Sequence, residues 1–157
     1  MRKFTVLCAC LLALGLSAAS GASNGALGDG SLVVKEGRGT LSVAVRGGII
    51  GRFDSGRVII EDPVPGDGTG PIVFGAQSSR ELTATKTLYI GTDVRFRLIG
   101  GFFRVKVIAT GMNVSVVGKG SATLDGGGFI DAGTYSLNGG DFVPMPSTAK
   151  PLQLGTP

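Results

Sequence analysis

Apolar and polar residues alternate along much of the chain, in short runs separated by glycine, aspartate, asparagine or serine. The alternation is clearest at residues 40–46, where Leu41, Val43 and Val45 share one side and small or polar residues occupy the other. Successive side chains of a strand point to opposite faces of a sheet. This pattern therefore predicts strands with one buried face, and signals for helices are nearly absent.

Short segments rich in Val, Ile, Thr and Phe continue from residue 31 to residue 125. The expected strands are residues 31–35, 40–46, 49–53, 57–61, 72–74, 81–90, 93–99, 102–109, 113–117 and 122–125. Such spacing is typical of an all-β domain, and we predict a single glycine-rich antiparallel β-sandwich or small barrel. A short β-solenoid is the alternative, because residues 113–128 have the character of one solenoid rung. No fixed period of roughly 20–25 residues supports the solenoid along the whole chain.

Two Gly-Gly pairs, at residues 47–48 and 100–101, each lie between two expected strands. Glycine suits two-residue hairpin turns because it readily adopts the positive φ that these turns require. We therefore expect a hairpin at Gly100-Gly101, in which Arg97 would lie opposite Arg104.

This hairpin would place its apolar side chains on one face and its cations on the other. The apolar face would hold Phe96, Leu98, Phe103 and Val105, and the cationic face Arg95, Arg97, Arg104 and Lys106. Like charges directly opposite one another destabilise a sheet. The four cations are therefore candidate anion-binding residues for a polyanion, such as a phosphate-bearing envelope polymer, or for a lipid headgroup. The alternative is that water or Asp93, Glu81 or Asp54 neutralises them.

The N-terminus has the features of a secretory signal peptide. Arg2 and Lys3 precede an apolar run over residues 4–16, and small residues follow. We expect a signal-peptide helix at residues 1–22, with cleavage near Ala19 or Ala22. An all-β domain would span residues 23–142, and a Pro-rich flexible tail residues 143–157. The run is too short to span a membrane, so a secreted, periplasmic or envelope location without a transmembrane segment is expected.

Composition excludes several kinds of chemistry from the exported part. The chain has no His and no Trp, and both cysteines, Cys8 and Cys10, lie in the expected signal. Thiol nucleophiles, imidazole bases and the usual zinc sites are thereby excluded. Without Arg2 and Lys3, 13 basic residues face 11 acidic ones, a net charge of +2, and no nucleic-acid partner is expected. An exported domain without disulfides suggests a bacterial source.

The acidic residues show no catalytic or metal-binding pattern. The loop at residues 61–68 lacks the ligand spacing of a calcium loop, and aspartates among glycines commonly stabilise turns. We expect no cofactor, no metal and no enzyme activity. The expected function is that of an exported structural or binding protein of the bacterial envelope or extracellular space. Its partner would be an anionic envelope polymer or another protein. A polyanion- or lipid-headgroup-binding module is the first alternative. A glycan hydrolase using Asp125 or Asp131 is the second.

Overall fold

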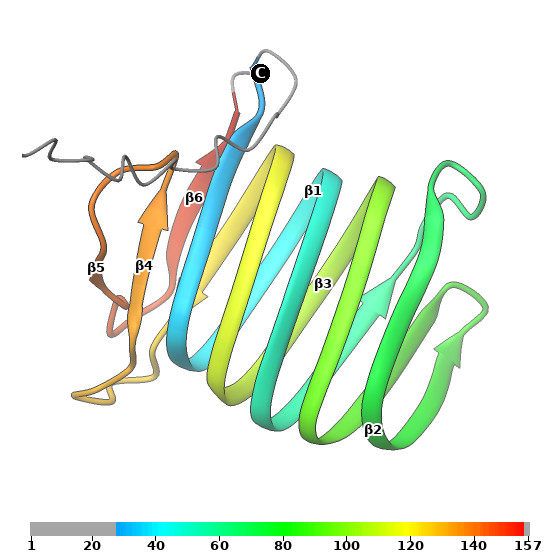
Figure 1. The fold of residues 1–157 in the computed structure, drawn as a ribbon, viewed down its shortest axis with the longest axis horizontal. Coiled ribbons are helices and arrows are strands. Elements are labelled where there is room, and N and C mark those ends of the chain that lie inside the picture. Colours follow the sequence, from blue (N-terminus) through cyan, green and yellow to red (C-terminus); the bar gives the residue numbers. More distant parts are fainter. Residues whose placement is uncertain (1–27, 156–157) are drawn as a thin grey trace, which may run out of the picture.

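The computed structural model describes residues 28–155, and every regular element in this range is a strand. The expected all-β antiparallel fold is confirmed, whereas the expected signal-peptide helix lies outside the described residues. The strands are β1 (Gly30–Glu61), β2 (Thr69–Thr83), β3 (Lys86–Asp125), β4 (Thr134–Leu137), β5 (Val143–Pro144) and β6 (Lys150–Leu154). They form one antiparallel sheet in the order β2-β3-β1-β4-β5, with β6 paired to β3, and the sheet is not closed (Figure 1).

The two long strands, β1 and β3, wind around each other as a coiled ribbon (Figure 1). Val43 of β1 pairs with Val105 on one side and with Ala122 on the other. Val105 in turn pairs with both Val43 and Ile60, which are 17 residues apart. Segments of β1 and β3 therefore alternate across the sheet, and each turn of the coil adds one segment of each strand.

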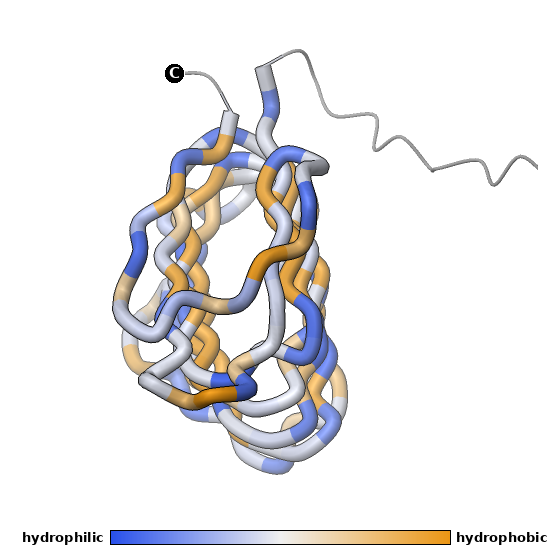
Figure 2. Tube along the Cα trace, turned by 90° about the vertical axis from the view of Figure 1, so that its left-hand side faces the viewer, coloured by the Kyte–Doolittle hydropathy of each residue, from blue (hydrophilic) through white to orange (hydrophobic). Residues whose placement is uncertain are grey.

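The coil is flattened into two facing layers, which Figure 2 shows end-on as two walls joined at their rims. The first layer contains residues 31–35, 48–53, 69–74, 94–99 and 113–117, together with β4. The second layer contains residues 40–46, 55–61, 78–83, 86–92, 102–109 and 120–125, together with β6. Each layer has an inner face toward the other layer and an outer face toward solvent.

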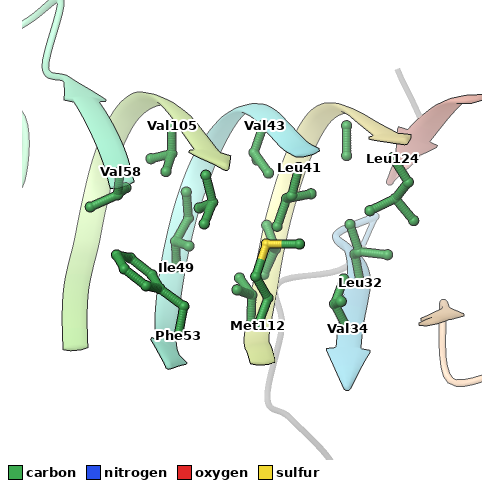
Figure 3. Packing of buried hydrophobic residues seen from close by; sticks show 14 of the residues in the cluster. Leu32, Val34, Leu41, Val43, Ile49, Phe53, Val58, Val105, Met112 and Leu124 are labelled. Atoms are coloured by element: carbon green, nitrogen blue, oxygen red, sulfur yellow. The ribbon is translucent and has the colours of Figure 1, made fainter. Parts of the chain in front are cut away.

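The hydrophobic core fills the space between the two inner faces (Figure 3). Leu41, Val43 and Val45 are buried, which confirms the face predicted from their alternation. From the first layer, Ile49 and Phe53 point toward them. Burial of branched and aromatic side chains of this kind stabilises a domain by about 1.5–3 kcal/mol per side chain. This packing sets the direction of every outward-pointing residue on the same strands.

The ribbon passes from one layer to the other at sharp corners, and Gly100-Gly101 is one of them. The predicted hairpin at this pair is wrong, because β3 continues through it. Residues 95–99 pair with β1 and β2, whereas residues 102–109 pair with other segments of β1. Both glycines have positive φ, 72° and 79°. This conformation turns the strand into the second layer without reversing it onto itself.

Two strands lie within residues 143–157, the segment that the sequence predicted to be a flexible tail. β5 pairs with β4, and β6 pairs with residues 120–124 of β3. Leu152 and Leu154 are buried against the core. Pro144 and Pro151 are compatible with pairing because β5 and β6 are edge strands, where a missing N–H need not break a ladder.

Candidate anion-binding surface

The four cations predicted to form one cluster are divided between the two layers. Arg95 and Arg97 project from the outer face of the first layer, and Arg104 and Lys106 from that of the second. The alternation itself is correct, since all four are exposed and the apolar residues between them are buried. The predicted pairing of Arg97 with Arg104 across a hairpin is wrong, because the chain does not reverse at Gly100-Gly101. Arg97 lies opposite Ile50 and Ile72 rather than opposite Arg104.

The first layer instead pairs Arg95 with Arg52 of β1, a residue that the sequence did not single out. The two arginines lie directly opposite each other in the register, and Arg97 projects from the same face two residues further along β3. We call Arg52, Arg95 and Arg97 the arginine cluster. Alternation around Phe53 could have shown that Arg52 points outward. Its position beside Arg95 depends on the coil and has no local signal.

Within residues 28–155, the arginine cluster has one salt bridge to a carboxylate. The guanidinium of Arg95 lies 3.2 Å from Oδ2 of Asp93, which precedes it by two residues on β3. Neither Arg52 nor Arg97 forms a salt bridge in the described part of the chain. Since both members of this ion pair are more than half exposed, water screens it strongly. Three guanidinium groups thus share one face with one partly screened carboxylate.

In the second layer, by contrast, a carboxylate stands between the cations. Glu61 lies directly between Lys86 and Arg104 in the register. Its Oε2 atom is 3.0 Å from Lys86 Nζ, and its Oε1 atom is 3.5 Å from the Arg104 guanidinium. The internal neutralisation considered for the four cations therefore occurs at Arg95, through the expected Asp93, and at Arg104, through Glu61, which the sequence did not indicate for this role.

A groove of about 520 Å³ runs over the arginine cluster on the outer face of the first layer. Charged and polar side chains in its lining include Lys35, Asn113 and Ser115 as well as the cluster. Its apolar lining includes Ile50 and Phe74, both exposed. The groove therefore offers cations and apolar side chains together, on paired strands of which β2 is the edge strand.

Two carboxylates of the acidic and glycine-rich loops, Asp67 and Asp125, accept hydrogen bonds that hold the chain at turns. Asp67 accepts hydrogen bonds from the backbone N–H of Phe102, at 3.2 Å, and from the Arg46 guanidinium, at 3.0 Å. Asp125 accepts a 2.8 Å hydrogen bond from the N–H of Gly127. Among residues 28–155, no three or more acidic residues gather in a group that could hold a metal ion. These contacts agree with the turn-stabilising roles expected of such aspartates.

No protein-family model matches the chain, and neither a curated protein nor a solved structure matches it. Within the described residues, no helix has the length and apolar character needed to cross a bilayer. The functional argument therefore depends on the geometry and charge of the surfaces described above.

Proposed function

We propose that the protein is an exported, non-enzymatic binding protein of the bacterial envelope or extracellular space, which binds phosphate-type anions through the arginine cluster. The observation that carries this proposal is the direct opposition of Arg52 and Arg95. In the second layer the equivalent place between cations is taken by Glu61. In the first layer no carboxylate stands between Arg52 and Arg95, because Asp93 contacts Arg95 from its own strand, and an external anion would take that place.

The physical argument begins with the repulsion between the paired arginines. Directly opposite residues of neighbouring strands have Cβ atoms about 4.5–5.5 Å apart, and like charges at this spacing destabilise the pair. A phosphate group between two guanidinium groups removes the repulsion and accepts several charge-assisted hydrogen bonds. Arginine is better suited to this than lysine, because its planar fork matches phosphate oxygens bidentately.

The first sequence-based alternative, a module for polyanions or lipid headgroups, thus has a revised set of residues. Arg95 and Arg97 are retained, Arg52 is added, and Arg104 and Lys106 are assigned to the other face. The interpretation of the body as a β-sandwich is supported by its two facing layers, and it provides the rigid outer face that such binding requires. Export depends on the signal peptide expected at residues 1–22.

Retention on immobilised polyphosphate during a salt gradient tests the proposal. The test variant carries Arg52→Ala with Arg97→Ala, and the matched control carries Arg104→Ala with Lys106→Ala, so both lose two positive charges. We expect the test variant to elute at clearly lower salt, corresponding to an affinity loss of roughly tenfold or more, since contacts to phosphate are strong and salt-dependent. The control should change by less than about threefold, because exposed, screened charges contribute little. Equal losses in both variants would contradict the proposal.

A further inference from the structure

We propose that the ligand of the arginine cluster is the headgroup of an anionic phospholipid, and that the outer face of the first layer lies against a lipid surface. This inference rests on the proposed function, because it names the source of the anion. It is carried by the apolar side chains that share the face with the arginines.

Each arginine of β3 in the cluster has an exposed apolar residue directly opposite it. Phe74 of β2 lies opposite Arg95, and Ile50 of β1 lies opposite Arg97. Phe74 is 66% exposed on the edge strand β2, and Ile50 is 57% exposed although its strand is paired on both sides. Ile72, on the other side of Arg97, is exposed as well. The face therefore places exposed apolar side chains directly beside both arginines of β3, and Arg97 has an isoleucine on each side.

A hydrophilic polyphosphate would neutralise the arginines but leave these apolar side chains in water. A lipid surface satisfies both, because the headgroup phosphates accept from the guanidinium groups and the upper acyl region removes Phe74 and Ile50 from water. Contiguous exposed apolar residues rimmed by polar ones commonly mark such contact surfaces. Long arginine side chains can also keep their charged ends at headgroup level while their stems lie along apolar surface.

The mixed character continues toward the edge of the first layer at β4 and β5. The ammonium group of Lys35 lies 4.1 Å from the centre of the Phe142 ring, and Phe142 is exposed. Lys35 also lines the groove over the arginine cluster. A cation beside an exposed aromatic ring thus extends the proposed contact surface from β2 to the β4 edge. Charge complementarity favours a membrane that contains anionic lipids, because each cation held near such a surface strengthens binding roughly fivefold.

The outer face of the second layer provides an internal control. Leu82 lies beside a groove there, and it is exposed like Phe74. Two of the three cations that line this groove, Lys86 and Arg104, are paired with Glu61, and the third is Lys106. Leu82 therefore lies beside two cations that an internal carboxylate already pairs, and we expect it to stay in water.

The absence of tryptophan from the chain makes each face separately observable. Phe74→Trp and Leu82→Trp each introduce a single fluorescent reporter into the full chain, one per outer face. Their first 27 residues are identical, so the N-terminal segment does not affect the comparison. The probes are vesicles of phosphatidylglycerol with phosphatidylcholine, vesicles of phosphatidylcholine alone, and soluble polyphosphate. Ile50→Trp is a second reporter on the first layer, and it is used in place of Phe74→Trp if that variant does not fold.

With anionic vesicles, we expect the emission of Phe74→Trp to shift to the blue and to be quenched by brominated acyl chains. Leu82→Trp should do neither, and neither reporter should shift with phosphatidylcholine alone or with polyphosphate. Adding Arg52→Ala and Arg97→Ala to the Phe74→Trp chain should weaken vesicle binding by roughly 25-fold, since two cations are lost. An unshifted reporter at both Phe74 and Ile50, or an equal shift at Leu82, would overturn the inference.

These outcomes separate the inference from the function on which it rests. If polyphosphate retention depends on Arg52 and Arg97 while the reporters stay unshifted in vesicles, the ligand is a polymer and the lipid surface is wrong. If the double substitution affects neither polyphosphate retention nor vesicle binding, the proposed function fails as well.

Discussion

Gly47 of β1 and Gly118 of β3 face each other across the corner where the ribbon leaves the second layer. A Cβ atom on Gly47 would collide with the carbonyl oxygen of Val117, and one on Gly118 would collide with that of Arg46. The two backbones approach so closely that neither residue can carry a side chain. This contact joins the two strands of the coil at a point where its direction changes.

Gly47→Ala should therefore lower the free energy of unfolding by about 2–3 kcal/mol, as overpacked substitutions do. For a domain of this size, that corresponds to a fall in Tm of roughly 4–10 °C. Gly48→Ala is the matched control, because a Cβ atom there meets only the Leu98 carbonyl oxygen at 3.8 Å. Thermal unfolding of both variants followed by circular dichroism measures the difference. Similar Tm values for the two variants would contradict the close backbone contact at this corner.

Phe103 and Phe102 are sequence neighbours with opposite environments, since Phe103 is buried in the core and Phe102 is half-buried on the outer face. Phe103→Ala should reduce stability by about 3–5 kcal/mol through lost burial and the cavity left behind. Phe102→Ala should cost clearly less. Urea denaturation, with the midpoint and slope compared between the variants, checks the expectation. A larger loss of stability for Phe102→Ala than for Phe103→Ala would contradict the assignment of Phe103 to the core.

Leu154 fixes the C-terminal strand to the body, because it is fully buried beside Gly120 of β3. Leu154→Asp buries an unpaired charge and should destabilise the protein by about 3 kcal/mol or more. Gln153→Asp, at an exposed position of the same strand, should have little effect. Limited proteolysis offers a second measurement, since the first variant should release a C-terminal fragment early. If both variants resist proteolysis equally, β6 does not contribute to the stability of the body.

Arg52→Glu would place a carboxylate directly opposite Arg95, in the arrangement that Glu61 has between Lys86 and Arg104. Replacing a repulsive cross-strand pair by an attractive one should raise stability by about 0.5 kcal/mol, a small gain because both side chains are exposed. Arg52→Gln, which removes only the repulsion, should gain less.

The gain from Arg52→Glu should appear in chemical denaturation at low salt and shrink near 1 M salt, where charges are screened over about 3 Å. The same substitution should abolish retention on polyphosphate. If the Arg52→Glu variant is more stable but still retained on polyphosphate, the arginine cluster is not the anion-binding site.

The faces of the strands could be predicted from the sequence, whereas the neighbours of each strand could not. Alternation correctly indicated that Phe96 and Val105 point inward, because that property depends only on the period of the strand and on hydrophobicity. The partner of Arg95 depends on how β3 leaves the corner at Gly100-Gly101. A Gly-Gly pair permits a reversal or a bend equally well, since both use positive φ. The predicted hairpin and its cationic face both assumed that the chain reverses at this pair.

Arg52 was missed for the same reason, since a cross-strand neighbour from a distant segment leaves no local pattern. Leu154 shows a different limit. Its segment is short and rich in proline, which predicts a loop or tail, yet burial of two leucines on a free sheet edge outweighs that tendency. Proline excludes a central strand but not an edge strand.

The alternation of β1 and β3 across the sheet also determines when the protein can fold. Val43 has no sheet partner before residue 105, and the nearer partners of β1 are all segments of β3 that follow a turn at residues 84–85. Contacts between such distant segments make folding slow, because long loops must close before any pairing stabilises them. A chain that leaves a ribosome or an export channel N-terminus first therefore has no sheet to form until β3 emerges. The first half of the chain therefore stays unfolded until the second half has emerged.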